Sequence, residues 1–244
     1  MSKLSAFFKE TLPFSLYALR YAARIPFFRF KSTKQVFTEI YEDNIWGNRE
    51  SASGSGSTQA TTRVIAERLP ALMRSLGAES FLDVPCGDFN WMAAVDLGVG
   101  RYVGADIVDG IIRQNAARFT DDVRSFVCLD LMREALPRVD VVFCRDCLVH
   151  FALADAMAAI QNFKRSGSTY VMLTTFPAHR RNREMVTGGW RPLNLQIAPF
   201  NFPEPVELIN EAFEGRGGKY RDKSVGVWRL ADIAPTEPAS PARP

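Results

Sequence analysis

The stretch SFLDVPCGDFNWM, residues 80–92, determines how the rest of the chain is interpreted. It begins as a buried strand should, with Phe81, Leu82 and Val84. The next four residues, Pro-Cys-Gly-Asp at 85–88, interrupt the strand, because proline fixes the turn and glycine admits positive φ. A glycine directly after a buried strand is typical of a site where a ligand approaches the backbone closely.

Strand and helix patterns alternate along the chain around this stretch. The predicted strands cover residues 81–84, 101–106, 124–131, 139–144, 169–176 and 224–230. The predicted helices cover residues 59–76, 91–97, 109–119, 153–166 and 205–214, and Pro70 divides or kinks the first of them. This alternation predicts an α/β fold with a mainly parallel sheet and helices on both faces.

An acidic residue stands at or just beyond the end of each of the first four predicted strands. These residues are Asp83, Asp106, Asp130 and Asp146. In open parallel sheets, ligands bind at the carboxyl ends of the strands. We therefore expect the four carboxyl groups to surround one binding site.

The acids also narrow the class of ligand. Asp106 lies 23 positions after Asp83, about where an acid reaches ribose hydroxyls in nucleoside-binding folds. A dinucleotide site needs several glycines around a pyrophosphate, whereas this turn has one glycine and the two acids Asp83 and Asp88. Such a turn favours a cationic nucleoside without phosphate, and S-adenosylmethionine has that chemistry.

At this point a family resemblance emerges. FLDVPCGDF, residues 81–89, resembles the first motif of class I S-adenosylmethionine-dependent methyltransferases. Asp83 falls on the acid of that motif and Gly87 on its second glycine, while Pro85 replaces the first glycine. Phe89 stands where many members have a third glycine.

Further motifs follow in the same order as in that superfamily. YVGADIV, residues 102–108, resembles the second motif, with Asp106 on the ribose-binding acid. VCLDL, residues 127–131, resembles the adenine-contacting segment, and VDVVFCRDCLVHF, residues 139–151, resembles the fourth-strand motif that His150 closes. The resemblance covers residues 80–230, and more narrowly it is to a bacterial branch of the superfamily.

The resemblance implies a fold, a cofactor and a set of binding residues. The expected fold is a Rossmann-like, seven-stranded, mainly parallel sheet with helices on both faces and an antiparallel last strand. The expected cofactor is S-adenosyl-L-methionine, and no metal is expected. The expected cofactor-binding residues are Asp83, Pro85, Cys86, Gly87, Asp106, Ile107, Asp130, Leu131 and Arg145.

Asp146 and His150 are the candidate catalytic residues, because both follow the fourth strand. Either could remove a proton from the acceptor. Asp146 could instead hold the methionine ammonium or the substrate, and His150 could be a core histidine. Arg145 could orient a carboxylate or lie at the surface.

Two segments are expected to complete the site. Residues 41–58 are expected to form a lid, in which Ser57 or Thr58 caps the next helix, although a flexible linker is the alternative. Residues 176–205 are long for a plain connection and are expected to wall the acceptor site. Trp190, Arg191 and Asn194 are its candidate substrate contacts. A surface loop packed over the sheet is the alternative.

These features predict a methyltransferase for a small-molecule or sugar acceptor, with O- or N-methylation left open. No nucleic acid is expected as a partner, because the body of the domain lacks a basic aromatic surface. A catalytically silent protein that binds the cofactor is one alternative. A nucleotide-binding oxidoreductase is another, which the missing glycines disfavour.

The two ends of the 244-residue chain differ from its centre in composition. Residues 1–36 carry seven Lys and Arg against one Glu and contain eight aromatic residues, which leaves a net charge of −3 for the rest of the chain. This extension could lie on an anionic membrane, or pack on the domain or on a second copy. The methyltransferase domain is expected at 37–232 and a disordered tail at 233–244. No secretory signal is evident, and the four cysteines, including the pair Cys144 and Cys147, are read as reduced thiols of a cytoplasmic protein.

Overall fold

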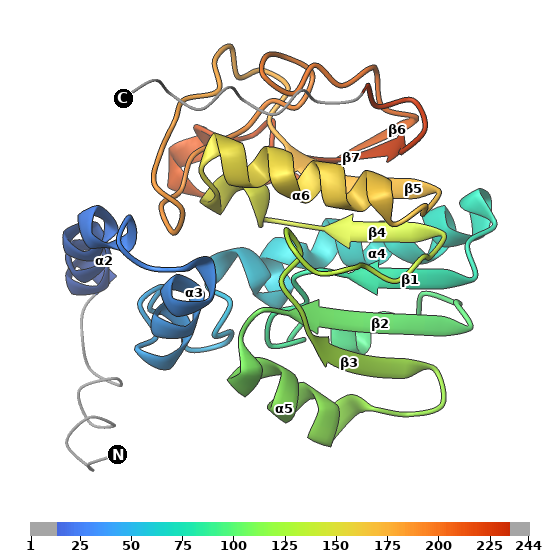
Figure 1. Cartoon of the computed structure of the whole chain (residues 1–244), viewed down its shortest axis with the longest axis horizontal. Coiled ribbons are helices and arrows are strands. Elements are labelled where there is room, and N and C mark those ends of the chain that lie inside the picture. Colours follow the sequence, from blue (N-terminus) through green and yellow to red (C-terminus); the bar gives the residue numbers. More distant parts are fainter. Residues whose placement is uncertain (1–13, 235–244) are drawn as a thin grey trace.

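The computed structural model describes residues 14–234, and seven strands among them form one sheet (Figure 1). The strands are β1 (Ser80–Asp83), β2 (Arg101–Asp106), β3 (Arg124–Cys128), β4 (Val141–Cys144), β5 (Tyr170–Thr175), β6 (Glu207–Asn210) and β7 (Ser224–Arg229). Their order in the sheet is β3-β2-β1-β4-β5-β7-β6. Strands β1 to β5 are parallel, whereas β7 is antiparallel to both β5 and β6. The predicted mainly parallel sheet with an antiparallel last strand is confirmed.

Helices cover both faces of this sheet, as predicted. The α-helices are α2 (Phe14–Phe28), α3 (Thr33–Glu42), α4 (Gln59–Leu76), α5 (Asp109–Phe119) and α6 (Leu153–Arg165). Short 3-10 turns are η1 (Ser55–Ser57), η2 (Met92–Ala94), η3 (Leu148–His150) and η4 (Arg216–Gly218). Figure 1 shows α6 in front of the sheet and α4 behind it. Helix α4 continues unbroken through Pro70.

The strand pleat divides the core into two apolar clusters, one on each face. In β1, Phe81 packs with Ile65 and Leu69 of α4, whereas Leu82 packs in the cluster of α6 with Ile160 and Phe163. All five side chains are buried. Successive residues of β1 pack on opposite faces of the sheet, so the strand is buried on both sides. Polar side chains are therefore expected at its carboxyl end rather than along its length.

Two predicted helices are absent from the structure. Residues 205–214 contain the edge strand β6, in which Ile209 is buried while Leu208 is exposed. Pairing of β6 with β7 overrode the helix-like spacing of the apolar residues. Residues 91–97 form only the turn η2, since Trp91, Met92 and Leu97 bury their side chains in a segment too short for a stable helix.

The expected domain limits also shift. The boundary expected at 36/37 falls inside α3, whose Val36 and Ile40 pack with Phe28 of α2. The expected tail begins too early, because Ile233 is buried in the main core cluster. Residues 1–13 and 235–244 lie outside the described residues. Between residues 14 and 234, no helix is both long and apolar enough to cross a membrane.

Candidate active site

A cavity of about 320 Å³ lies at the carboxyl ends of β1, β2 and β4. Strand β1 stands between β2 and β4, where the order of the parallel strands reverses, and such switch points are the usual ligand sites of open α/β sheets. All the predicted site residues except Arg191 and Asn194 line this cavity. These are Asp83, Pro85, Cys86, Gly87, Asp106, Ile107, Asp130, Leu131, Arg145, Asp146, His150 and Trp190.

Asp106, at the end of β2, is a buried carboxyl group that backbone donors hold in place. Its Oδ2 accepts from the Gly87 amide at 3.2 Å and its Oδ1 from the Val108 amide at 2.9 Å. Burial nevertheless raises the pKa of Asp106 from 3.8 to about 6. The cavity therefore contains an acceptor for which a ligand's hydroxyl groups would be favourable partners.

Asp83, at the end of β1, is the second buried carboxyl group. The Tyr102 hydroxyl donates to its Oδ2 at 2.6 Å. Burial raises the pKa of Asp83 from 3.8 to about 7 in spite of this bond. Among residues 14–234, neither Asp83 nor Asp106 forms a salt bridge, so a cationic ligand in the cavity would relieve an existing electrostatic cost.

Asp130, after β3, is half-buried at the cavity wall. Its Oδ1 accepts from the Met132 amide at 2.9 Å, and its Oδ2 is 3.8 Å from Nε of Arg133. Asp130 therefore stabilises a turn and borders the cavity at the same time.

The turn after β1 requires glycine at Gly87. Its φ is +54°, and a Cβ atom there would lie 2.2 Å from Oγ of Ser53. The segment 41–58 thus approaches the turn too closely for any side chain at this position.

Phe89 occupies the position of the third glycine without obstructing the cavity. It adopts a left-handed backbone, with φ of 58°, and its ring is buried in the core. There it packs against the rings of Tyr102, Phe119 and Phe126, with centroids 5.0–5.4 Å away. The chain therefore follows a glycine-like path at this point while the side chain faces away from the ligand site.

The segment 41–58 lines part of the cavity and is hydrogen-bonded to the turn after β1 at Asp88. The Asp88 carboxylate accepts from Oγ of Ser51 at 2.9 Å, the Ala52 amide at 2.7 Å and Oγ of Ser53 at 3.2 Å. Thr58 ends the segment and caps α4, as expected, by accepting from the Thr61 amide.

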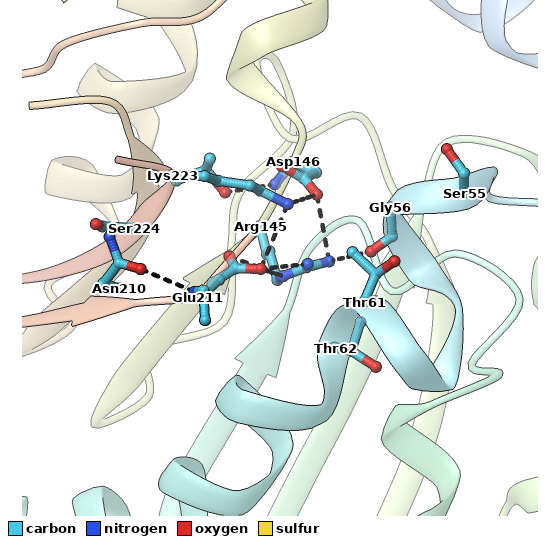
Figure 2. Close-up of polar contacts among 12 residues, drawn as sticks. Ser55, Gly56, Thr61, Thr62, Arg145, Asp146, Asn210, Glu211, Lys223 and Ser224 are labelled. Atoms are coloured by element: carbon cyan, nitrogen blue, oxygen red, sulfur yellow. Dashed lines mark hydrogen bonds and ion pairs between the residues drawn. The ribbon is translucent and has the colours of Figure 1, made fainter. Parts of the chain in front are cut away.

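Four charged residues, three of them buried and one half-buried, form an ion cluster at one end of the cavity (Figure 2). They are Arg145, Asp146, Glu211 and Lys223. Nη2 of Arg145 lies 2.5 Å from Glu211, and Nζ of Lys223 lies 2.5 Å from Asp146 and 3.3 Å from Glu211. Nη1 of Arg145 donates to the Gly56 carbonyl at 2.9 Å, so the cluster also holds the segment 41–58.

The ion cluster keeps Asp146 ionised. Burial alone would raise the pKa of Asp146, but the Lys223 ammonium and the Arg145 guanidinium outweigh it and bring the pKa to about 2. The backbone of Asp146 is left-handed, with φ of 51°, and its amide donates to Oγ1 of Thr174 at 2.8 Å. A carboxylate with so low a pKa is a weak base at neutral pH.

His150 is suited to accept a proton. Its Nδ1 lies 2.7 Å from the Gly189 carbonyl, which can only accept, so Nδ1 carries the hydrogen and Nε2 carries the lone pair. Burial lowers the pKa of His150 below 6.5 and keeps the ring neutral at pH 7. The indole of Trp46, in the segment 41–58, packs against the imidazole at a tilt of 33°, with the ring centroids 4.9 Å apart.

Aromatic side chains form the wall beside the ion cluster. Trp190 packs edge-on against Phe176 and Tyr220, with centroids 6.1 and 4.9 Å away. Phe213 also lines the cavity, and Nζ of Lys223 lies 5.5 Å from the centre of its ring. This wall is apolar except for the Tyr220 hydroxyl and the Trp190 indole N–H.

Arg191 and Asn194 depart from the expectation that they contact the acceptor. Arg191 is buried and donates to the carbonyls of Leu148 and Phe151 at 3.1 and 2.7 Å. Asn194 is buried and its Nδ2 donates to the Pro177 carbonyl at 2.9 Å. Arg191 also donates from Nε to the Arg183 carbonyl at 2.8 Å, so each of the two side chains satisfies a backbone carbonyl of the long loop, which has few regular hydrogen bonds of its own.

Several cavity residues were missed from the sequence. Lys223 and Tyr220 come from the chain just before β7, and Phe213 follows β6. Tyr21 and Thr33 come from the N-terminal extension. No motif identifies any of them. Glu211 and Lys223 lie next to apolar strands, and charged residues in such places are buried only when they pair with opposite charges, which is the one signal that the sequence offered.

Comparisons with known proteins agree with this architecture. No family model matches the chain, and no curated protein matches its sequence. The crystal structure of Burkholderia thailandensis 1,6-didemethyltoxoflavin-N1-methyltransferase with S-adenosylhomocysteine is 17% identical, with a TM-score of 0.59 over 80% of this chain and 86% of that one. Human N-acetylserotonin methyltransferase, solved with S-adenosylmethionine, is 11% identical, with a TM-score of 0.59 over 87% of this chain and 67% of that one. The chain therefore has the fold of the S-adenosylmethionine-dependent methyltransferases.

Proposed function

We propose that the protein is an S-adenosylmethionine-dependent methyltransferase acting on a small-molecule or sugar acceptor. The observation that carries this proposal is the pair of buried carboxyl groups, Asp83 and Asp106, in one cavity at the switch point of the sheet. Neither has a salt-bridge partner within residues 14–234, and both have raised pKa values. A ligand with a positive charge and free hydroxyls fits them, whereas a pyrophosphate does not.

The residues around the cavity fit the parts of such a cofactor. Asp106 would accept from the ribose hydroxyls, and Asp130 would border the adenine between Ile107 and Leu131. Gly87 leaves the backbone bare beside the cavity, where the methionine part would lie. S-adenosylmethionine supplies a methyl group carried on a sulfonium.

The rest of the proposed mechanism belongs to the chain's own residues. The aromatic wall and the segment 41–58 exclude water and hold the acceptor, and positioning supplies most of the rate. Nε2 of His150 takes the proton of a hydroxyl acceptor, and Nδ1–H stays on the Gly189 carbonyl. Asp146, whose pKa is about 2, orients polar groups and does not act as the base.

Calorimetry with the full chain tests the cofactor. We expect S-adenosylmethionine and S-adenosylhomocysteine to bind with micromolar dissociation constants and NAD not to bind. NAD binding without S-adenosylmethionine binding would sink the assignment in favour of an oxidoreductase. A panel of hydroxyl and amine acceptors, followed by release of S-adenosylhomocysteine, then separates an enzyme from a protein that only binds the cofactor.

A further inference from the structure

Helix α2 presents an apolar face to solvent. Leu19 and Phe27 are 66% and 63% exposed, and Phe30, in the turn that follows the helix, is 74% exposed. Ala22, Ala23 and Pro26 are also exposed and complete the spacing 19, 22/23, 26/27, 30. These positions fall on one side of a helix. We call these six residues the outer face of α2.

The opposite side of α2 packs on the protein and fixes the orientation of the helix. The Tyr21 hydroxyl donates to the Gly188 carbonyl at 2.6 Å, and Phe28 is buried with Val36 and Ile40 of α3. Gly188 has φ of +97°, and a Cβ atom there would lie 2.5 Å from Val36. The helix is therefore packed against the protein on one side, and its outer face stays exposed on the other. Figure 1 shows α2 beyond α3, away from the sheet.

The segment that carries the outer face contains basic residues and no acidic ones. Between residues 14 and 38 the chain carries five Lys and Arg and no Asp or Glu. Arg24, Lys31 and Lys34 pair with acids of α3 or its C-terminal end and of α5. Arg20 lies in the middle of α2 and Arg29 directly follows its last residue, and the guanidinium of Arg29 lies 4.7 Å from the centre of the Phe30 ring.

We propose that α2 docks on the surface of an anionic lipid bilayer, with its outer face at the boundary between the headgroups and the acyl chains. A helix with an apolar face and basic flanks lies in the plane of an anionic interface. The alternative occupant is a second copy of the chain. Two copies joined through this face would bring like-charged segments together, which is unfavourable.

Docking would also set where the cavity stands. Tyr21 of α2, together with Thr33 and Phe37 of α3, lines the cavity. A bilayer against the outer face would therefore lie beside the candidate active site, on the side of the N-terminal helices.

Co-sedimentation of the full chain with vesicles tests this proposal. We expect the chain to bind vesicles in which about 30% of the lipid is phosphatidylglycerol and the rest is phosphatidylcholine. We expect little binding to vesicles of phosphatidylcholine alone. Raising NaCl to about 0.5 M should weaken binding several-fold, since salt screens the basic residues. Binding to both vesicle types alike, or to neither, would overturn the proposal.

A triple variant distinguishes binding through the outer face from nonspecific binding of exposed apolar side chains to vesicles. Leu19→Ser, Phe27→Ser and Phe30→Ser together should lower the partition coefficient at least tenfold. The matched control carries Val206→Ser and Leu208→Ser, two side chains 50% and 44% exposed on or beside β6, and should bind like the wild type. Equal binding by the triple variant and the control would contradict the proposal.

Two further measurements keep the result interpretable. Light scattering reports the oligomeric state, and a wild-type dimer that the triple variant converts to a monomer would make the outer face an interface between copies and overturn membrane docking. Calorimetry with S-adenosylmethionine on each variant should give unchanged dissociation constants, so the docking test stands whatever becomes of the proposed function.

Discussion

The substitution Asp106→Asn should weaken cofactor binding and stabilise the free protein at the same time. In the free protein, burial raises the pKa of Asp106 from 3.8 to about 6, which corresponds to about 3 kcal/mol against the ionised form. Asparagine is nearly isosteric and keeps an acceptor for the Val108 amide, but it carries no charge. It loses the acceptor for the Gly87 amide, which offsets about 1 kcal/mol of this difference. The variant should therefore gain on the order of 2 kcal/mol in the free energy of unfolding at pH 8.

The gain should depend on pH with a definite sign. The folded-state pKa lies above the unfolded value, so between pH 4 and pH 6 the folded wild type binds more protons than the unfolded chain and loses stability as the pH rises. Above pH 6 the whole difference is present. At pH 4 the carboxyl group is protonated in the folded state, and the difference between variant and wild type should fall below about 1 kcal/mol.

Binding should move in the opposite direction. A carboxylate that accepts from ribose hydroxyls contributes about 1.5–3 kcal/mol per bond, and asparagine retains one neutral acceptor. We expect the dissociation constant for S-adenosylmethionine to rise at least tenfold. Urea denaturation at pH 4 and pH 8 and calorimetry at pH 8 measure the two effects.

Asp96→Asn is the matched control for this experiment. Asp96 is exposed and its Oδ1 accepts from the amide two residues on, at Gly98, as Asp106 does from Val108. The control should change neither stability by more than about 0.5 kcal/mol nor cofactor affinity. If Asp106→Asn leaves the dissociation constant unchanged, Asp106 does not bind ribose. If the substitution destabilises the protein at pH 8, the buried carboxylate does not lower the stability of the free protein.

The remaining predictions concern the ion cluster, the base and the seat of α2. Lys223→Met should cost about 3 kcal/mol of stability by urea denaturation, because it leaves a buried carboxylate short of a partner; a loss no larger than that of Lys219→Met at the surface would contradict this. His150→Ala should lower turnover at least tenfold while changing the dissociation constant for S-adenosylmethionine less than threefold. Wild-type turnover should fall only when the pH drops through the pKa of His150, which burial holds below 6.5. Gly188→Ala should cost at least about 2 kcal/mol, since its φ is +97° and an added Cβ would meet α2 and α3; thermal denaturation measures it, and an unchanged midpoint would refute the packing described there.

The carboxyl ends of the parallel strands were predictable from the sequence because their signals are local. An apolar run followed by an acid, as at Asp83 and Asp106, marks both the strand and its polar end within a few residues. In a parallel sheet these ends meet at one edge, so the topology gathers residues that the chain separates. That is why all nine predicted cofactor contacts line one cavity.

The acceptor side was less predictable, because its polar residues act on the backbone. Arg191 and Asn194 look like substrate contacts in a loop without periodicity, yet such a loop leaves many carbonyls without regular partners. Buried polar side chains donate to some of these carbonyls, as Arg191 does to Arg183 and Asn194 does to Pro177. Within an irregular segment, the sequence does not distinguish a side chain that serves the ligand from one that serves the loop.

The charged residues at the carboxyl end of β4 pair with residues that are far away along the chain. Arg145 and Asp146 follow β4 directly, whereas Glu211 and Lys223 lie 66 and 77 positions from their partners along the chain. Buried pairs of this kind contribute little net stability, but removing one member is costly. The cluster contains two basic and two acidic side chains, and losing any one of them would leave a charge without a partner. The four side chains are therefore held in one arrangement. Glu211 follows the last residue of β6 and Lys223 precedes the first residue of β7, and the Glu211 amide donates to the Lys223 carbonyl at 3.0 Å. We infer that the β6–β7 pair serves to hold Arg145 and Asp146 in place at the cavity.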